Sequence, residues 1–393
     1  MKQTIYLAWR YLAFHRLKTF ILWTSITLIL YLPVGLRVLV NQSSEQLTRR
    51  AEATLLVVGS KGSPLELVLN TLYFRSDFPE PMTYAEVLKL QQVRLAPIVP
   101  MYVRYHARGH PIVGTSFEYF DYRGLELQSG RMFTLLGECV LGSRVARSLD
   151  ASVGDSVTSS PENLFDLTGE YPLNMDIVGI LEHSDTPDDD AIFVDVKTTW
   201  VIEGIGHGHR DLSERDAASA VLSREGNRIV ANASIVQYNK ITKENADEFH
   251  FHGDTSDFPL TAVIALPPDQ KSSALLQGRY QSAEDRSQIV RPSEVMGELL
   301  DTILTVESFV VAGAVIVGLA TFALAALVFM LSLRLRRREI ETLFKIGGSR
   351  ASVGTLMASE VVIVLATGVV LAAVLTFLTS QFGATLVRAL LRM

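Results

Sequence analysis

The sequence contains almost no cysteine and none of the common nucleotide-binding or hydrolytic motifs. Among its 393 residues only Cys139 is a cysteine, which excludes an internal disulfide framework and a zinc site built from several cysteines. No G-x-x-x-x-G-K-[ST] loop occurs, and the glycine-containing stretch at residues 59–63 lacks that spacing. G-x-S-x-G elbows and H-E-x-x-H helices are also absent. We therefore expect that the chain is not an enzyme and that it holds no cofactor of its own.

Charge is scarce and unevenly distributed. Charged residues make up 20% of the chain, hydrophobic residues 48%, and the formal net charge is −6. The basic residues gather beside long apolar segments, so the middle of the chain is acidic. No basic face remains for nucleic acid, which excludes a nucleic-acid partner.

Three apolar segments are long enough to cross roughly 30 Å of hydrocarbon. They lie within residues 19–40, 306–333 and 355–380. A signal peptide is the alternative interpretation of the first, but its apolar core is long and only a weak cleavage site follows it. Residues 1–18 are basic and predict an interfacial helix on the cytoplasmic side. We predict an integral membrane protein with one N-terminal and two C-terminal spans and an extracytoplasmic amphipathic tail at residues 381–393.

Residues 41–305, between the first and second spans, have the composition of a large folded α+β domain. Strands are predicted at residues 51–59, 96–108, 111–115, 138–141, 155–159, 175–181, 191–196 and 260–266. Helices are predicted at residues 64–74 and 268–280, and another follows Thr83 as its N-cap. Residues 204–232 are polar and predict an insertion. An amphipathic helix at residues 291–306 is expected to continue without a break into the second span.

The loop at residues 334–354 combines a basic cluster with a short amphipathic helix. By the positive-inside rule the arginines place it in the cytoplasm, and they can bind anionic headgroups. Four apolar residues then share one helical face, and two glycines end the helix. A plain topology signal is the alternative interpretation, but such a signal needs neither feature. The residues that we predict to couple to a cytoplasmic partner are Arg336, Arg337, Arg338, Glu339, Ile340, Leu343, Phe344, Lys345, Ile346, Gly347 and Gly348.

Small residues recur four apart in the two C-terminal spans. Ala314 and Gly318 lie in one, and Gly368 and Ala372 lie in the other. Such stripes let helices approach closely in lipid. We predict that these four residues pack at helix–helix contacts, although small residues are also simply common in membrane helices.

Two H-x-H pairs are the metal-ligating candidates of the acidic domain. They are His207 with His209 and His250 with His252. In a strand both rings of such a pair face the same way, and imidazole nitrogens bind divalent metals. The simpler interpretation is solvated loop histidines beside a polar insertion, so no resident metal is predicted.

Four segments resemble the MacB/FtsX/LolC-type permease subunits of ABC transporters, the mechanotransmission class. The basic N-terminal segment AWRYLAFHRLKTFIL is similar to the interfacial helix of that family. Residues 130–157 resemble its GR-x-F … VVLG-x-x-VA-x-x-L … GD-x-V pattern, and residues 175–181 match the strand that follows. Residues 336–353 resemble the R-R-E-I-x-x-L-x-x-L-G-A-S signature. The resemblance extends over essentially the whole chain.

This resemblance implies a bacterial inner-membrane protein with a cytoplasmic N-terminus and a periplasmic domain. It implies a homodimer that works with a dimeric cytoplasmic ABC ATPase, which holds the ATP and Mg²⁺. Membrane lipid and a periplasmic adaptor or lipoprotein are the other expected partners. The implied cargo is a lipoprotein, lipid, peptide or small hydrophobic compound at or beyond the outer leaflet. The family usually has four spans, and here we expect three.

An ATPase-driven signalling role is the alternative function. In that case the same motion would activate a periplasmic hydrolase or report a bound ligand. Stimulation of ATP hydrolysis by a cargo favours transport, whereas stimulation by a bound hydrolase favours activation.

Overall fold

The computed structural model describes residues 2–75, 79–160, 172–208, 221–225, 228–231, 239–280, 286–335, 341–342, 345 and 349–390. The chain divides into two compact units. The first comprises Met1–Arg49 and Gly297–Met393, and the second comprises Arg50–Met296.

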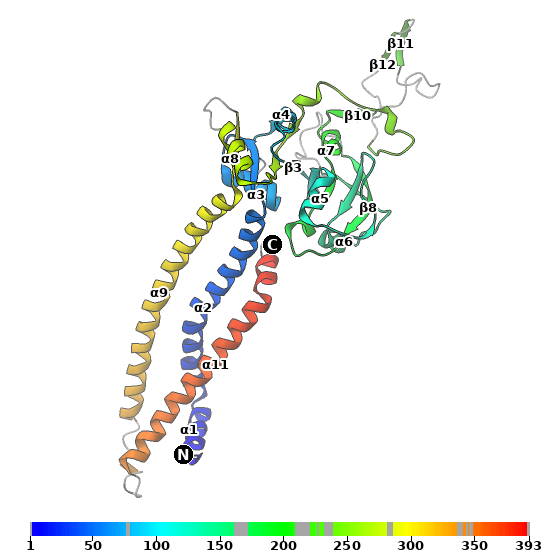
Figure 1. Cartoon of the computed structure of the whole chain (residues 1–393). Coiled ribbons are helices and arrows are strands. Elements are labelled where there is room, and N and C mark those ends of the chain that lie inside the picture. Colours follow the sequence, from blue (N-terminus) through cyan, green and yellow to red (C-terminus); the bar gives the residue numbers. More distant parts are fainter. Residues whose placement is uncertain are drawn as a thin grey trace. The chain divides into compact units, whose positions relative to one another are not determined.

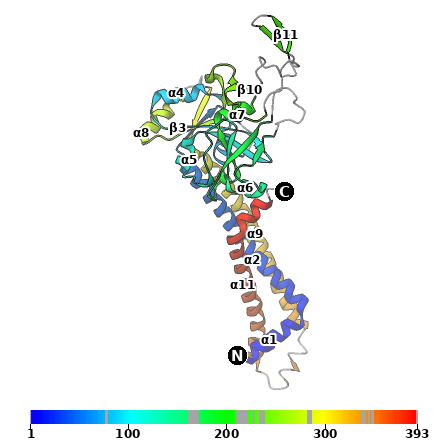
Figure 2. The same ribbon diagram turned by 90° about the vertical axis from the view of Figure 1, so that its right-hand side faces the viewer.

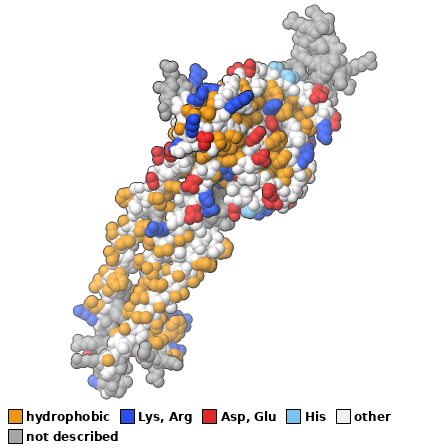
Figure 3. Space-filling model, viewed as in Figure 1, with side chains coloured by type: hydrophobic (Ala, Val, Ile, Leu, Met, Phe, Trp, Pro, Cys, Tyr) orange, Lys and Arg blue, Asp and Glu red, His pale blue; other side chains and the backbone are white. Residues whose placement is uncertain are grey.

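The first unit is built from long helices. These are α1 (Lys2–Phe14), α2 (Arg16–Glu52), α9 (Pro292–Leu335) and α11 (Arg350–Leu390), of which α2 and α9 extend into the second unit (Figure 1). Their large apolar side chains are widely exposed, with Phe309 at 73% and Phe322 at 70%, and such side chains line the helices in Figure 3. A continuous apolar surface of this kind is typical of helices that face lipid.

Three helices in the described part of the chain are long and apolar enough to cross a membrane. Their candidate spans are Thr19–Gln42, Pro292–Leu324 and Val353–Gly383. Helix α9 runs unbroken from Pro292 to Leu335, so the predicted continuous helix is confirmed. Helix α11 continues through residues 381–390, where we expected a separate tail. The side of the membrane on which that end lies stays a prediction.

Close contacts on α2 involve two of the four small residues predicted to pack. A Cβ added at Gly368 would lie 2.8 Å from Cγ2 of Ile26, and one at Gly318 would lie 3.1 Å from Cγ2 of Ile29. Ala372 is buried and Ala314 is half-buried. The hydroxyl groups of Tyr31 and Thr379 also lie 2.8 Å apart. Helix α2 therefore packs against both α9 and α11 within this unit.

The second unit is an α+β domain. Its helices are α3 (Pro64–Tyr73), α4 (Ala85–Val93), α5 (Phe117–Arg123), α6 (Ser143–Leu149), α7 (Val196–Ile202) and α8 (Gln270–Arg279), with 3-10 turns η1 (Pro187–Asp190), η3 (Ala246–Glu248) and η4 (Thr255–Asp257). Its strands are β1 (Leu56–Ser60), β2 (Met82–Thr83), β3 (Ile98–Ala107), β4 (His110–Thr115), β5 (Leu127–Gly130), β6 (Glu138–Leu141), β7 (Ser156–Thr158), β8 (Asn174–Leu181), β9 (Ile192–Asp195), β10 (Gly206–Gly208), β11 (Val221–Glu225), β12 (Arg228–Ala231), β13 (Phe249–Phe251), β14 (Pro259–Leu260), β15 (Ala262–Ala265) and β16 (Ser287–Val290).

A mixed sheet forms the centre of this domain. Its strand order is β16-β1-β15-β3-β4-β9-β6-β8-β5, and β7 also pairs with β8. Strand β3 is long enough to pair with β15 through its first half and with β4 through its second. Residues Arg108 and Gly109, both at positive φ, make the turn from β3 to β4. Helices α3 and α4 pack on β3, and α7 packs on β4. Figure 2 shows α4 and α7 close to β3.

Most predicted strands of the domain are confirmed, with two corrections. The predicted strand at residues 51–59 begins only at Leu56, because α2 continues to Glu52. Thr83 lies in β2 and does not cap the next helix, whose N-cap residue is Tyr84. The polar insertion contains β10, β11 and β12. Strand β11 pairs antiparallel with β12, and β10 pairs antiparallel with β13, which lies beyond the predicted insertion.

Candidate functional site

The two long helices join the domain at neighbouring strands. Helix α2 leads into β1, and β16 leads into α9. Strands β1 and β16 are paired antiparallel, with Val57 opposite Val290. Both helices are therefore joined to the same edge of the sheet.

Arg50, near the end of α2, is held by a buried network inside the domain. Its Nη1 donates to Oδ2 of Asp188 at 2.6 Å, and its Nη2 donates to Oδ1 at 3.0 Å. The Tyr119 hydroxyl accepts from Arg50 at 2.8 Å and donates to Asp188 at 2.6 Å, while Nε of Arg50 donates to the carbonyl of Leu72. Burial by itself would lower the pKa of Arg50 and raise that of Asp188. The ion pair outweighs burial, so Arg50 titrates above its usual range and the pKa of Asp188 falls to about 2.

The 3-10 turn η1 supplies the acids that meet the basic groups of the neighbouring helices. Asp188 pairs with Arg50, as described above. Asp189 and Asp190 both face Arg144 of α6, at 3.1 and 3.0 Å. Gly142, just before α6, has no room for a side chain because a Cβ there would lie 2.2 Å from the carbonyl oxygen of Asp188. The glycine of the V-L-G motif is therefore required for α6 to reach η1.

A serine, a histidine and an aspartate meet beside this turn, but they do not form a catalytic triad. The hydroxyl of Ser143 lies 3.1 Å from Nδ1 of His183 and donates to Oδ1 of Asp189 at 3.0 Å. Oδ2 of Asp189 lies 2.9 Å from the same Nδ1. In a Ser-His-Asp triad the serine and the acid contact opposite nitrogens of the ring. Here both contact Nδ1, and Ser143 is buried, so the group is a structural network.

The G-R-x-F segment holds Glu138 at the start of β6. Nη1 of Arg131 donates to Oε2 of Glu138 at 2.8 Å, and the backbone N–H groups of Thr134 and Leu135 donate to the same oxygen at 2.8 and 3.1 Å. Burial by itself would raise the pKa of Glu138, but these hydrogen bonds outweigh it and lower the pKa to about 2. Gly130, at φ +80°, lets the chain turn tightly against the carbonyl of Val178. The motif is thus a carboxylate-centred corner between β5 and β6.

Glu138→Gln removes an ion pair and is expected to lower the free energy of unfolding by about 1–2 kcal/mol at pH 7. The expected loss is this small because solvent at the half-exposed Arg131 already screens the pair. The folded pKa lies below the ordinary 4.5. The stabilisation by the Glu138 carboxylate is therefore complete above pH 4.5 and is lost as the pH falls toward about 2. Urea unfolding of both proteins at pH 7 and in acid measures this. The difference should shrink on acidification, and a pH-independent difference would contradict the role of the carboxylate.

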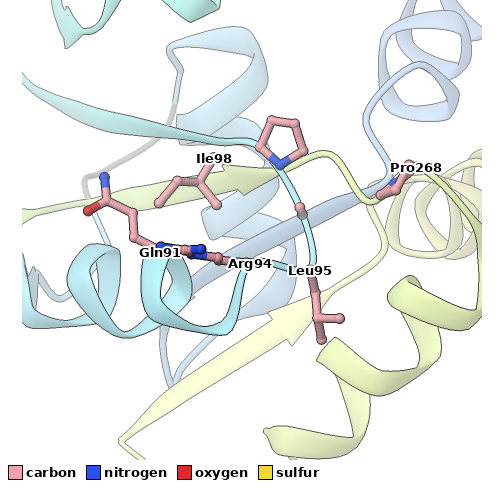
Figure 4. A pocket seen from close by; sticks show the side chains of 7 residues that line it. Gln91, Arg94, Leu95, Ile98 and Pro268 are labelled. Carbon is pink, nitrogen blue, oxygen red and sulfur yellow. The ribbon is translucent and has the colours of Figure 1, made fainter.

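A shallow hollow of about 400 Å³ opens where α4 gives way to β3. It is lined by Gln91, Arg94, Leu95, Ala96, Pro97, Ile98 and Pro268 (Figure 4). The lining is mostly apolar, and it contains one cation, Arg94, and no acidic side chain. It offers no constellation for covalent or acid–base chemistry.

Comparison with known families identifies the domain. The model of the MacB-like periplasmic core domain matches residues 24–234, more than half of the chain. The chain belongs to this MacB-like family. It is therefore a membrane protein with an extracytoplasmic domain, and its family is that of the ABC transporter permeases. The match includes the Arg50 network and the Arg131–Glu138 corner.

Solved structures of related domains are also similar to the MacB-like chain. The periplasmic region of MacB from Actinobacillus actinomycetemcomitans aligns at 11% identity and a TM-score of 0.34, over 64% of this chain and 97% of that one. The extracellular domain of the noncanonic ABC-type transporter YknZ from Gram-positive bacteria aligns at 15% identity and a TM-score of 0.31, over 60% of this chain and 98% of that one. No curated protein matches the chain.

The predicted coupling segment of this MacB-like chain is described only in part. Lys345 is helical and exposed. Ser349 precedes α11, and its carbonyl accepts from the N–H of Val353 at 3.2 Å, as expected at a helix N-terminus. Arg336, Arg337, Arg338, Glu339, Ile340, Leu343, Phe344, Ile346, Gly347 and Gly348 lie outside the described residues. Their contact with an ATPase stays a prediction.

Three of the four candidate histidines are brought together. His207 on β10 lies directly opposite His250 on β13, and His252 follows just after the end of that strand. His209 lies outside the described residues. Asp188, Asp189 and Asp190 of the acidic domain face Arg50 and Arg144. Sequence reasoning gave the residue types of this cluster but not the pairing of β10 with β13.

Proposed function

We propose that the chain is the permease subunit of a MacB/FtsX/LolC-type ABC transporter, which passes motion from a separate ATPase to its extracytoplasmic domain. The observation that carries this proposal is the MacB-like family match, which covers a domain inserted between long apolar helices. The moved substrate is a lipoprotein, lipid, peptide or small hydrophobic compound at or beyond the outer leaflet. In this arrangement the N-terminus and the loop at residues 334–354 are cytoplasmic.

The attachment of the helices to the domain supports mechanical coupling. Helix α9 is continuous from the domain through its apolar span, so it can transmit an axial push or a rotation without a hinge. Helix α2 is fixed at its domain end by the buried Arg50–Asp188 pair. Both deliver force to the paired strands β1 and β16. A rigid packed sheet responds to such force as a body rather than by local bending.

Energy in this proposal comes from a partner. The sequence has no phosphate-binding loop, so ATP and Mg²⁺ bind to a dimeric cytoplasmic ATPase. Two copies of this chain would pair in the membrane, because a closed two-fold assembly matches a two-fold ATPase. The apolar helix at residues 340–346 would enter a groove on that ATPase, which is the helix-in-groove mode of recognition.

Affinity capture of the full-length chain from native membranes tests the proposal. We expect an ATPase with a phosphate-binding loop to be captured in equal amount with the chain. A variant with residues 340–346 replaced by a glycine-serine linker should lose that ATPase. The matched control carries Arg94→Ala in the hollow of the domain and should retain it. Capture that is unaffected by the linker would overturn the coupling role, and the absence of any ATPase would overturn the proposed function.

A further inference from the structure

We propose that His207, His250 and His252 form a binding site for a borderline divalent transition-metal ion, with Zn²⁺ as the reference ion. Strands β10 and β13 pair antiparallel, and His207 is directly opposite His250. His250 lies on β13 and His252 directly follows its last residue, and the ring centroids of the two histidines are 4.8 Å apart. One nitrogen of each ring lies within 4.8 Å of a nitrogen of both others.

The spacing of these nitrogens fits shared coordination. Nε2 of His207 and Nε2 of His252 are 3.4 Å apart. Two imidazole ligands at 2.0–2.1 Å in a tetrahedral zinc site are about 3.3 Å apart. The ring centroid of His250 lies 5.1 Å from that of His207 and 4.8 Å from that of His252. A small rotation of the third ring completes a three-histidine face, and a water molecule or a substrate group can take the fourth position.

The backbone selects the metal-binding nitrogen of His250. Its Nδ1 lies 3.1 Å from the carbonyl oxygen of Glu248. A carbonyl only accepts hydrogen bonds, so Nδ1 carries the proton and Nε2 keeps its lone pair for a metal. This arrangement, in which the distal ring nitrogen is held by a carbonyl or carboxylate, is the usual support of metal-bound histidine.

The opposite face of the β10–β13 pair fixes the histidines in place. Gly206 is opposite Phe251, and Gly208 is opposite Phe249. Each phenylalanine ring covers its glycine so closely that an added Cβ would lie 2.5 or 2.6 Å from it. Phe251 also packs edge-on against the buried Trp200, with ring centroids 6.3 Å apart. The pattern G-H-G against F-H-F thus turns the aromatic rings toward the core and the imidazoles outward.

A second cluster of potential metal ligands in the domain is less suited to binding a metal ion. His183, Asp185 and Asp189 also lie within 4.8 Å of one another. There, however, the guanidinium of Arg144 lies 3.1 Å from Asp189 and 3.7 Å from Asp185, so a cation already occupies the acidic side.

The position of the site gives the ion a structural consequence. The chain leaves β10 after Gly208 and returns to β13 at Phe249. An ion that binds both strands closes the loop formed by the intervening residues, and closing a long loop restricts the unfolded chain most. Metal binding should therefore hold the base of the insertion together and raise the melting temperature.

Zinc titration of the full-length, chelator-treated chain in detergent tests the site. We expect one Zn²⁺ per chain, with a dissociation constant on the order of 1 µM, and no competition from Mg²⁺. His207→Ala, His250→Ala and His252→Ala should each weaken binding about tenfold or more, and the triple variant should abolish it. His183→Ala and His110→Ala are the matched controls and should leave the affinity unchanged.

A second measurement uses the unaltered protein in case a variant folds poorly. Zn²⁺ should protect the peptides containing His207, His250 and His252 from diethyl pyrocarbonate, while those containing His110 and His183 stay reactive. Equal zinc affinity in the triple variant, absence of saturable binding, or unprotected histidines at saturating zinc would each overturn the site. None of these results bears on the captured ATPase, so the proposed transport function is tested separately.

Discussion

Arg50→Met is expected to lower the free energy of unfolding of the domain by about 3–5 kcal/mol, because the variant leaves the Asp188 carboxylate buried without its cation. The two side chains are 7% and 1% exposed, so water cannot replace the guanidinium. The hydroxyl groups of Tyr119 and Thr186 still donate to the carboxylate, but they carry no charge. Hydrogen exchange of peptides from β6 and β9 in the full-length chain, measured across a urea series, gives this free energy.

Acidification should narrow the difference between the Arg50→Met variant and the wild type. In the wild type the pKa of Asp188 is lowered from 3.8 to about 2. The stabilisation by the Arg50–Asp188 pair is thus present above pH 3.8 and is lost as the pH falls toward about 2. Without Arg50, burial raises the pKa of this carboxyl. The variant therefore becomes less destabilised as its carboxyl takes up a proton.

The adjacent arginine provides a matched control for Arg50. Arg49 contacts Glu45 at 3.4 Å, but both side chains are more than 70% exposed. Arg49→Met should therefore change the free energy of unfolding by less than about 0.5 kcal/mol. The double variant Arg50→Met/Asp188→Leu removes both buried charges and should recover most of the loss. Equal effects of Arg49→Met and Arg50→Met would contradict a buried anchor at Arg50.

Local patterns in the sequence were sufficient to predict much of the domain. The alternation of β8, in which every second residue of Asn174–Leu181 is buried, is readable as period two. The long amphipathic and apolar pattern that became α9 was equally clear. Helices α5, α6 and α7 were missed because each has seven residues, about two turns, which is too short to establish a helical period.

Contacts between distant residues could not be predicted from one sequence. Arg49 and Arg50 are adjacent arginines that the sequence does not distinguish. Only the fold shows that Asp188, 138 positions away, pairs with Arg50. The histidine face likewise depends on β10 pairing with β13 across an insertion. The glycines opposite Phe249 and Phe251 favour the pairing of these two strands, because each leaves room for a phenylalanine ring. This pattern can be interpreted only once the register of β10 and β13 is known.

Phe344→Asp is expected to uncouple ATP hydrolysis from function while the domain stays folded. The sequence places Phe344 on the apolar face of the predicted cytoplasmic helix at residues 340–346. A carboxylate there cannot enter an apolar groove without a large desolvation cost. The assay compares ATP hydrolysis by the captured ATPase complex in nanodiscs with transport or activation by the same complex. Transport should fall to background, and stimulation of hydrolysis by cargo should be lost.

Two control variants separate the loss of an apolar contact from the gain of a charge. Phe344→Leu keeps an apolar side chain and should keep most of the coupling. Thr342→Asp adds the same charge two residues earlier, roughly 200° around a helix, and should also keep it. Loss of coupling in Phe344→Asp alone therefore assigns the contact to the apolar side chain at this position. Full activity of Phe344→Asp would leave the segment as a topology signal, and the force would then have to enter the chain elsewhere.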